Sequence, residues 1–395
     1  MSKLPSRTGV APVAKPARNT ETGAGVGGWA DSLLQEVLAA TYWFDPGEVG
    51  KPYSASVRFS GRRIEVIGKS QPRDSFTREE TIAGVVPGSG AVSITTRVSG
   101  INLGEWLISA EPVRRKGSAV LVRSYPWSNH GGPRSVKPAL WYWRTPAIAS
   151  GPASPVKTRL APLVSTPGAH PLAWPALVGL GVLVGLAAQA MIVARAHLEL
   201  DLALAVSISA IASGVIGAKA WFLILHRRSW RAFLTEGSCI QGFILGAAVA
   251  GTAALALLRL PVGTLLDSVS PGLFFGMAIG RHGCFFAGCC TGRPTASRWG
   301  LWASDRRVGT RRIPTQLLEA LACLIIGSAA LILLLQTGPP VPGALFVGAL
   351  AAYTLFRQFI LPLRAEGRKT SIGRPLTIGA SVLVLIADFL WSTVA

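Results

Sequence analysis

The most constraining feature of this 395-residue chain is a series of long apolar runs in its C-terminal half. From Pro171 onward, these runs reach the length of about 20 residues that a helix needs to cross a bilayer. Half of all residues are apolar and only 15% are charged, which suits a membrane protein. We therefore predict seven transmembrane helices, at residues 171–193, 202–225, 238–258, 262–280, 316–335, 341–363 and 375–395.

The residues before the first run have a different pattern. Residues 1–30 are polar and contain no apolar core of a secretory signal, so we expect a disordered tail and no signal peptide. The leucines and valine of residues 31–43 predict a short amphipathic helix. The whole segment 31–135 is otherwise β-rich, because short alternating runs are separated by Gly and Pro. We expect strands at 53–59, 63–67, 92–98, 106–110 and 119–123.

These patterns together give the expected architecture. A series of prolines predicts a stiff linker over residues 136–170, between the β-rich segment and the first apolar run. Several short strands at this spacing are typical of a β-sandwich. The predicted fold is a polytopic α-helical membrane protein of seven transmembrane helices, with an N-terminal all-β, sandwich-like domain.

Basic residues are distributed unequally between the two ends of the predicted helices. In short loops, lysine and arginine favour the cytoplasmic side of a membrane. The opposite end has only Arg195 and Arg259, whereas the end that carries the N-terminal domain has the arginine-rich 281–314 loop and three further basic segments. We therefore expect the N-terminal domain and this loop to be cytoplasmic.

The same basic end predicts anionic phospholipid headgroups as partners. The net charge of +20 does not predict a nucleic-acid partner, because it is dispersed and accompanies no RNA- or DNA-binding motif. Five ionisable side chains lie inside apolar runs, where charges are costly and often functional. Mutual pairing and snorkelling to the surface are the alternatives for this set, which comprises Lys219, Asp267, Glu319, Arg357 and Asp388.

A segment rich in glycine, arginine and cysteine follows the fourth run. It reads Gly280-Arg-His-Gly-Cys-Phe-Phe-Ala-Gly-Cys-Cys-Thr-Gly-Arg293. We predict a turn at the membrane surface, whose glycines let the backbone approach a ligand and whose arginines can grip a phosphate. Its cysteines suit small apolar packing, a reactive thiolate or S-acylation. The spacing of Cys284, Cys289 and Cys290 lacks the paired Cys-x2-Cys of common zinc sites, so we expect no metal, and we expect no cofactor.

Several motifs occur in a fixed order along the helical half. They are Asp267-x3-Pro271-x8-Gly280-Arg281-x-Gly283, Phe285-Phe-Ala-Gly288, Gly292-Arg293-Pro294-Thr295, Arg312-Ile-Pro-Thr-Gln-Leu-Leu-Glu319 and Phe356-Arg357, preceded by Gly237-Ser-Cys-Ile-Gln241-Gly242. This order and spacing resemble the prolipoprotein diacylglyceryl transferase family over roughly residues 171–395. Residues 1–170 have no counterpart in that resemblance.

The resemblance implies a function and a site. Members of the family transfer a diacylglyceryl group from phosphatidylglycerol to a lipoprotein cysteine, in the bacterial plasma membrane. It implies that Arg281 and Arg357 bind the lipid phosphate and polarise the bond that breaks. Gln241 and Cys289 complete the expected catalytic set, at positions where the family has a histidine and a glutamate. The expected substrate-binding residues are Gly283, Cys284, Gly292, Arg293, Gln316, Glu319 and Lys219.

Two functions remain open at this point. The first is a transferase that moves a lipid group to a thiol. The second is a non-catalytic lipid-binding membrane protein whose soluble domain recruits a protein partner. Gln241 favours the second, because glutamine cannot act as a base at neutral pH. The thiols of Cys284, Cys289 and Cys290 instead favour an enzyme whose chemistry differs from that of the family.

Overall fold

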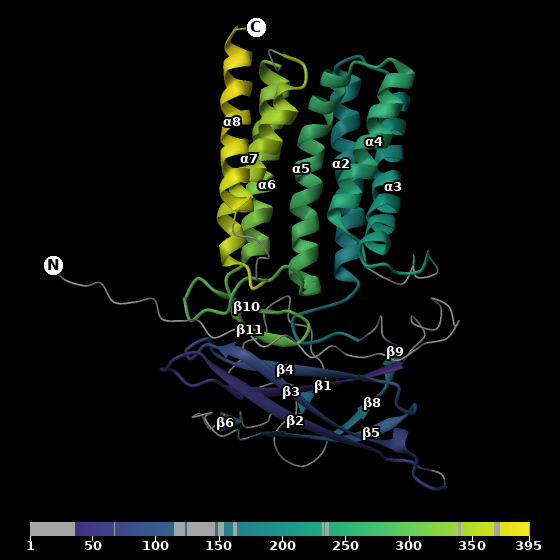
Figure 1. Cartoon of the computed structure of the whole chain (residues 1–395), viewed down its shortest axis with the longest axis vertical. Helices are drawn as coiled ribbons and strands as arrows, with labels where there is room; N and C mark the ends of the chain where they lie inside the picture. Colours follow the sequence, from purple (N-terminus) through teal and green to yellow (C-terminus); the bar gives the residue numbers. More distant parts are fainter. Residues whose placement is uncertain are drawn as a thin grey trace, which may run out of the picture.

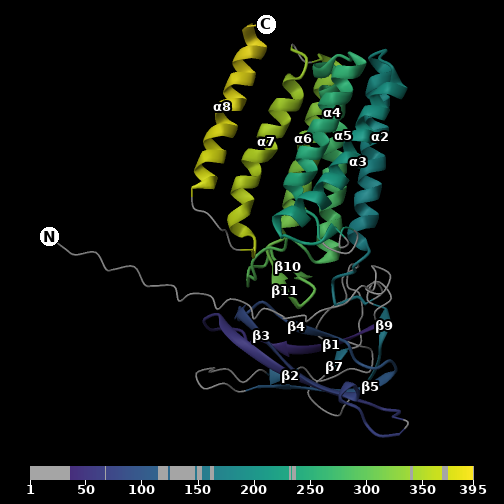
Figure 2. The same cartoon turned by 45° about the vertical axis from the view of Figure 1, so that its right-hand side comes forward.

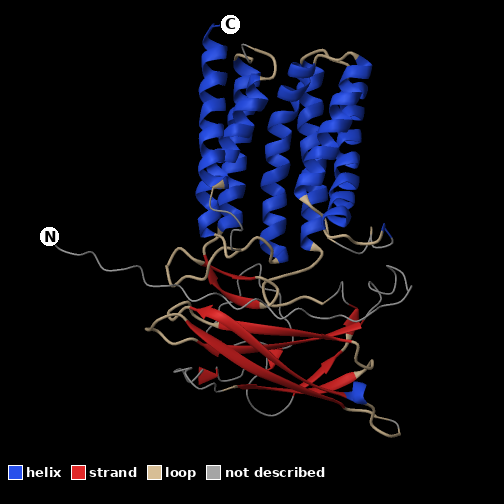
Figure 3. Ribbon diagram, in the orientation of Figure 1, coloured by secondary structure: helices blue, strands red, loops and turns tan. Residues whose placement is uncertain are grey.

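The computed structural model describes residues 36–66, 68–113, 123–124, 147–148, 154–160, 164–230, 233, 237–338, 341–366 and 372–394. A bundle of long helices stands on a β-sandwich, and the two parts are stacked end to end (Figure 1). Figure 3 shows that helix and strand are almost completely segregated between the two parts. The predicted tail at residues 1–30 lies outside the described residues.

Seven helices among the described residues are long and apolar enough to cross a membrane, which confirms that prediction. A short 3-10 turn, η4 (Leu361–Leu363), continues one of them. The helices are α2 (Ala173–Arg195), α3 (Leu200–Leu225), α4 (Ile240–Leu258), α5 (Val262–Ala287), α6 (Thr315–Gln336), α7 (Ala344–Ile360) and α8 (Gly373–Val394).

Helix α5 is the main departure from the predicted boundaries. It continues to Ala287, about two turns beyond the predicted end at residue 280. The segment around Arg281 is therefore helix and not a turn, which corrects the prediction. The turn begins at Gly288, whose φ of 67° terminates the helix in the left-handed conformation.

Glycines bring α2 and α5 into close contact. A Cβ atom added to Gly276 would lie 2.7 Å from the carbonyl oxygen of Gly181, and one added to Gly185 would lie 2.9 Å from that of Gly272. These four residues form a small-xxx-small pattern on each helix, which is typical of closely packed membrane helices. Helix α5 also packs against α6 and α7, so it lies inside the bundle and carries its polar side chains there.

Asp267 has a structural role at the end of the bundle away from the sandwich. Its carboxylate accepts hydrogen bonds from the backbone N–H groups of Gly343 (2.6 Å) and Phe346 (3.0 Å). It therefore caps the N-terminus of α7, where N–H groups lack helical partners. Fourteen residues of helix, about 21 Å, separate it from Arg281.

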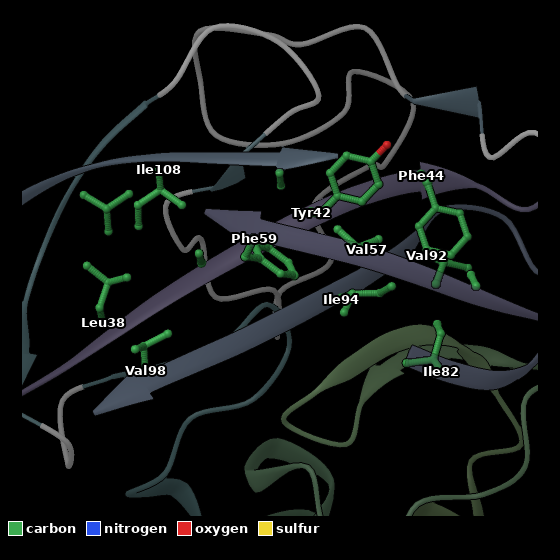
Figure 4. Close-up of a cluster of buried hydrophobic side chains, with 14 of the residues drawn as sticks. Leu38, Tyr42, Phe44, Val57, Phe59, Ile82, Val92, Ile94, Val98 and Ile108 are labelled. Carbon is green, nitrogen blue, oxygen red and sulfur yellow. The ribbon is translucent and has the colours of Figure 1, made fainter. Parts of the chain in front are cut away.

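The N-terminal domain is a sandwich of two sheets, as predicted. One sheet contains β1 (Glu36–Asp45), β4 (Val92–Ser99), β6 (Arg123–Ser124), β7 (Ala147–Ile148) and β9 (Arg159–Leu160). The second has the order β3 (Ser75–Val85), β2 (Tyr53–Arg63), β5 (Glu105–Pro112) and β8 (Ser154–Lys157), with the 3-10 turn η1 (Pro72–Asp74) before β3. The side chains between the sheets form one apolar core, in which Tyr42, Phe44, Phe59 and Ile94 are fully buried (Figure 4).

Three predictions in this region need correction. The helix expected at residues 31–43 is wrong, because residues 36–45 are strand β1; Leu38, Ala40, Tyr42 and Phe44 alternate inward with the period of a strand. The strand expected at 63–67 is also wrong, since β2 ends at Arg63. Strand β3 was missed because charged side chains occupy much of it. Strands β8 and β9 lie inside the segment expected to be a linker.

The two parts of the molecule share a sheet. The segment between α5 and α6 contains a hairpin, β10 (Leu301–Ser304) and β11 (Val308–Arg312), and β11 pairs antiparallel with β4 of the sandwich. Trp302 stacks on Trp43 at a centroid distance of 5.4 Å and donates a hydrogen bond to the carbonyl of Ala91 (2.8 Å). Arg307 forms an ion pair with Glu80 (2.6 Å). The hairpin lies between bundle and sandwich in both views (Figure 2).

We expect Trp302→Ala to loosen this junction. The substitution removes the stack on Trp43 and the hydrogen bond to Ala91, at a cost of roughly 3 kcal/mol. Hydrogen–deuterium exchange should therefore rise in β11 and along β4. Trp299 is the matched control, because its ring is 76% exposed and Trp299→Ala removes no contact with the sandwich that the structure describes. Equal exchange in both variants would show that Trp302 does not hold the junction.

Candidate functional site

A buried ion pair joins α5 to α6 near the sandwich end of the bundle. The guanidinium of Arg281 lies 2.7 Å from the carboxylate of Glu319, whose side chain is 2% exposed. Arg281 also donates a hydrogen bond to the hydroxyl of Tyr353 on α7 (3.0 Å). Three helices are thus connected through one guanidinium, as expected for charges that are costly inside a membrane.

Arg357 lies one helical turn beyond Tyr353 on α7 and so shares its face. Its side chain is half-buried. Within the part of the chain that the structure describes, its guanidinium makes no hydrogen bond and no ion pair. It is close enough to Tyr353 and Cys323 to act on both electrostatically. The structure therefore brings Arg281 and Arg357 into one polar region and leaves the second of them unsatisfied.

The thiols of Cys284, Cys289 and Cys290 form a compact cluster beside this region. All three sulfur atoms lie within 4.8 Å of one another. Cys284 comes from the last turn of α5 and is buried, whereas Cys289 and Cys290 follow the helix end and are half-buried. Cys290 has a φ of 56°, a left-handed conformation that is uncommon for a residue with a side chain.

The first turn of α6 fixes the backbone of the cysteine turn. The side-chain amide of Gln316 donates to the carbonyl of Cys289 (2.9 Å), and the hydroxyl of Thr315 donates to that of Cys290 (3.3 Å). Gln316, one of the expected substrate-binding residues, thus positions the turn. Arg364, which follows η4, is 6% exposed and acts electrostatically on Cys290.

The electrostatics of the cluster distinguish its members. The pKa of the Cys290 thiol is lowered, because its sulfur accepts hydrogen bonds from the Cys284 and Cys289 thiols and lies near Arg364 and Arg281. The pKa of the Cys289 thiol is raised, because its proton is held by the other two sulfurs. Within the cluster, the lowered pKa therefore belongs to Cys290 and not to Cys289, the thiol expected in the catalytic set.

Three further residues of the predicted site have packing or backbone contacts in the structure. Gly283 faces α2, where an added Cβ would lie 3.2 Å from the Cβ of Leu177. Gly292 lets its strand pass against the carbonyl of Ile313, and it pairs with Arg364 in an isolated bridge. Arg293 is exposed and donates to the carbonyl of Arg364 (3.3 Å). The two glycines thus allow close packing, and Arg293 links the cysteine turn to the chain that follows η4.

Two other predicted residues lie on helices that pack mainly with each other. Gln241 is exposed in the first turn of α4 and accepts a hydrogen bond from the thiol of Cys239 (2.6 Å). Lys219 is half-buried on α3, the main partner of α4. The interactions described for Gln241 do not connect it with Arg281.

Three residues near the site were not predicted. Tyr353 has no sequence signal except its spacing of four from Arg357. Arg364 is one of several basic residues after α7 and is not distinguished by its neighbours in sequence. Arg306, between β10 and β11, donates to the carbonyl of Ala287 at the end of α5 (2.6 Å). Only tertiary contacts identify these roles.

Comparison with known proteins identifies the family of the helical half. The family model described as prolipoprotein diacylglyceryl transferase matches residues 164–392, which is more than half of the chain. The chain belongs to this family. Strands β1 to β9 precede the match, whereas the β10–β11 hairpin lies inside it. The family is one of transferases, so the chain is assigned to that class of enzyme.

Individual relatives match up to about half of the chain. A phosphatidylglycerol–prolipoprotein diacylglyceryl transferase of Nostoc sp. is 28% identical over 207 residues, which is 48% of this chain and 73% of the relative. A phosphatidylglycerol–prolipoprotein diacylglyceryl transferase of Dehalococcoides mccartyi is 30% identical over 177 residues, which is 42% of this chain and 66% of the relative. The phosphatidylglycerol–prolipoprotein diacylglyceryl transferase 2 of Streptomyces coelicolor is 38% identical over 135 residues, which is 32% of this chain and 42% of the relative.

We expect Arg281→Ala and Arg357→Ala to differ in stability. Removing Arg281 leaves the buried Glu319 carboxylate unpaired, which should cost about 3 kcal/mol. Removing Arg357 breaks no protein contact that the structure describes, so its thermal unfolding in detergent should match that of the wild type. The double variant Arg281→Met, Glu319→Leu should recover most of the lost stability. Equal destabilisation by both alanine variants would mean that Arg357 has a partner in the folded state.

Proposed function

We propose that this protein transfers a diacylglyceryl group from phosphatidylglycerol to a thiol acceptor, and that Arg281 and Arg357 bind the lipid phosphate. The observation that carries the proposal is the half-buried Arg357, unpaired among the described residues, one turn from the tyrosine that holds Arg281. A guanidinium without a partner in a membrane bundle suits an anionic ligand. The names of the relatives supply the lipid and the reaction type.

The two arginines fit the charge changes of this reaction. The acceptor thiol loses its proton to water, and its sulfur forms a bond to a glyceryl carbon while the bond from that carbon to the phosphate oxygen breaks. The electron pair of the broken bond leaves with glycerol phosphate, so negative charge grows on the phosphate. Guanidinium groups that already point at this position stabilise such charge without reorganisation. Glu319 and Tyr353 hold Arg281 in place.

A covalent relay through Cys289 does not fit the same chemistry. Its attack on the lipid would create a thioether, and transfer from a thioether would require a thiolate to leave a saturated carbon. The phosphate leaving group has no such difficulty. We therefore assign the acceptor role to a thiol that is supplied to the site, and Cys289 a role beside it.

A non-catalytic phospholipid-binding protein is the alternative. Gln241 favours this alternative, because it occupies the position where the family has a histidine. Its side-chain amide accepts a hydrogen bond from the Cys239 thiol and cannot take up a proton at neutral pH. Under this alternative the two arginines bind the lipid in the same way, but no thioether forms.

Lipid binding and transfer can be measured separately on the purified full chain. We expect Arg357→Ala to weaken phosphatidylglycerol binding 10-fold or more, since a charge-assisted hydrogen bond in a desolvated site is worth roughly 1.5–3 kcal/mol. Arg298→Ala is the matched control, because Arg298 is exposed and stacks on Trp299. Native mass spectrometry reports the bound lipid.

Transfer is followed as the mass gain of a cysteine-containing peptide in the presence of phosphatidylglycerol. We expect a diacylglyceryl thioether and release of glycerol phosphate, both strongly reduced in Arg357→Ala. Lipid binding without transfer would support the non-catalytic alternative. Equal binding by Arg357→Ala, Arg298→Ala and wild type would overturn the phosphate site itself.

We further propose that the sandwich and the hairpin face the cytoplasm of a bacterial cell, with the membrane crossed seven times. Both lie at the same end of the bundle, which is the end with most of the basic residues outside the helices. A reporter that is active only in the cytoplasm should be active when fused at residue 1 and silent at residue 395. The reverse pattern would place the sandwich on the outer side.

A further inference from the structure

We infer that Cys284, Cys289 and Cys290 form a three-thiolate site for one thiophilic d10 cation of the zinc class, with a fourth position open to the acceptor thiol. The catalytic half of this inference rests on the proposed function. The binding half rests only on the geometry of the cluster and is tested separately.

The sulfur positions match those required by a single ion. Zinc–sulfur bonds are about 2.3 Å long, so three ligands in tetrahedral arrangement lie roughly 3.8 Å from one another. All three sulfur atoms here fall within 4.8 Å of one another, so small side-chain rotations suffice. The sequence spacing concealed this, because the cluster is built from a helix end and the turn after it and not from a Cys-x2-Cys loop.

The backbone holds the cluster in place before any ion binds. The N–H of Cys289 donates to the carbonyl of Cys284 (3.0 Å), which folds the turn back over the last turn of α5. Gln316 and Thr315 fix the next two carbonyls. Cys290 holds a left-handed backbone conformation, which is unfavourable for a residue with a side chain, and its sulfur lies near the other two. Such strain often marks a functional site.

The surrounding charge suits the loaded cluster. Three thiolates and one divalent cation carry a net charge of −1. Arg364 and Arg281 act electrostatically on the cluster. Arg364 is 6% exposed; its Nη2 pairs with Glu366 (3.1 Å), and its Nε has no hydrogen-bond partner among the described residues. A buried guanidinium with an unused donor is costly, and a nearby anionic cluster offsets that cost.

Three protein ligands with one open position are typical of catalytic zinc sites, whereas structural sites have four. The half-buried state of Cys289 and Cys290 leaves such a position approachable. A thiol that coordinates the ion loses its proton outright, and the proton passes to water. The sulfur then attacks the glyceryl carbon, the carbon–oxygen bond to phosphate breaks, and glycerol phosphate leaves with the electron pair. The resulting thioether is a weaker ligand and is released.

This assignment supplies what Gln241 cannot. A family histidine is replaced by an amide, so the acceptor thiol needs another means to become a thiolate. A thiophilic cation beside the two phosphate-binding arginines provides it without a base. The loss of the histidine and the gain of three clustered thiols then have one explanation.

Metal binding is tested on the purified full chain in detergent. After treatment with a chelator, titration with Cd2+ should give a thiolate-to-metal charge-transfer band that saturates at one ion per chain. Elemental mass spectrometry should find one Zn2+ per chain after reloading and dialysis. Cys290→Ser and Cys284→Ser should each weaken binding 10-fold or more. Cys239→Ser and Cys323→Ser are the controls and should bind as wild type, because neither residue belongs to the cluster.

Alkylation keeps the test decisive if a serine variant folds poorly. In the wild type, bound Zn2+ should protect Cys289 and Cys290 from iodoacetamide, and chelation should remove the protection. The absence of both a stoichiometric ion and metal-dependent protection would overturn the site. So would undiminished Cd2+ binding by a folded Cys290→Ser variant. If the chelated protein transfers the lipid group to the peptide as fast as the zinc-loaded protein, the catalytic role of the ion is overturned but the metal site is not. If the ion binds and no transfer occurs, the metal site stands and the proposed transferase function is overturned.

Discussion

The arrangement of the bundle depends on the ion pair between Arg281 and Glu319. Each of these two charges would be costly if it were left without its partner inside the bundle, so the pair favours the register of α5 and α6 that joins them. Tyr353 extends the constraint to α7, which places Arg357 beside the pair. The same register brings the first turn of α6 against the cysteine turn. One buried contact thus determines the position of both the arginine region and the thiols.

The sequence was informative where composition alone decides structure. Seven helices and the sandwich followed from apolar length and alternation, and the motifs around Arg281 indicated the family. Features created by tertiary contact were not accessible. The sequence predicts a helix at the start of β1 because Leu33, Leu34, Val37 and Leu38 recur with helical spacing, whereas the residues that the sandwich buries, Leu38, Ala40 and Tyr42, alternate as in a strand.

The candidate site shows the same division. Arg281 and Arg357 stand out in sequence because charged residues are rare within apolar runs, and the cysteines stand out because three of them occur within seven residues. The roles of Gly283 and Gln316 could not be separated from substrate binding, since motif position does not reveal which neighbour a residue faces. Gly283 contacts α2 and Gln316 holds the backbone of Cys289. The position of Arg364 near the cysteine turn is revealed only by the structure, in which the chain after α7 returns to pair with Gly292.

The sheet shared by the two parts imposes an order on biosynthesis. Ser93 and Gly309 are hydrogen-bonded neighbours separated by 216 residues. The sandwich emerges from the ribosome first, yet the edge of β4 lacks its partner until four helices have been made. An unpaired strand edge is a site of aggregation. The nascent domain therefore needs protection during membrane insertion, and evolution cannot exchange it for another soluble domain without also replacing the hairpin.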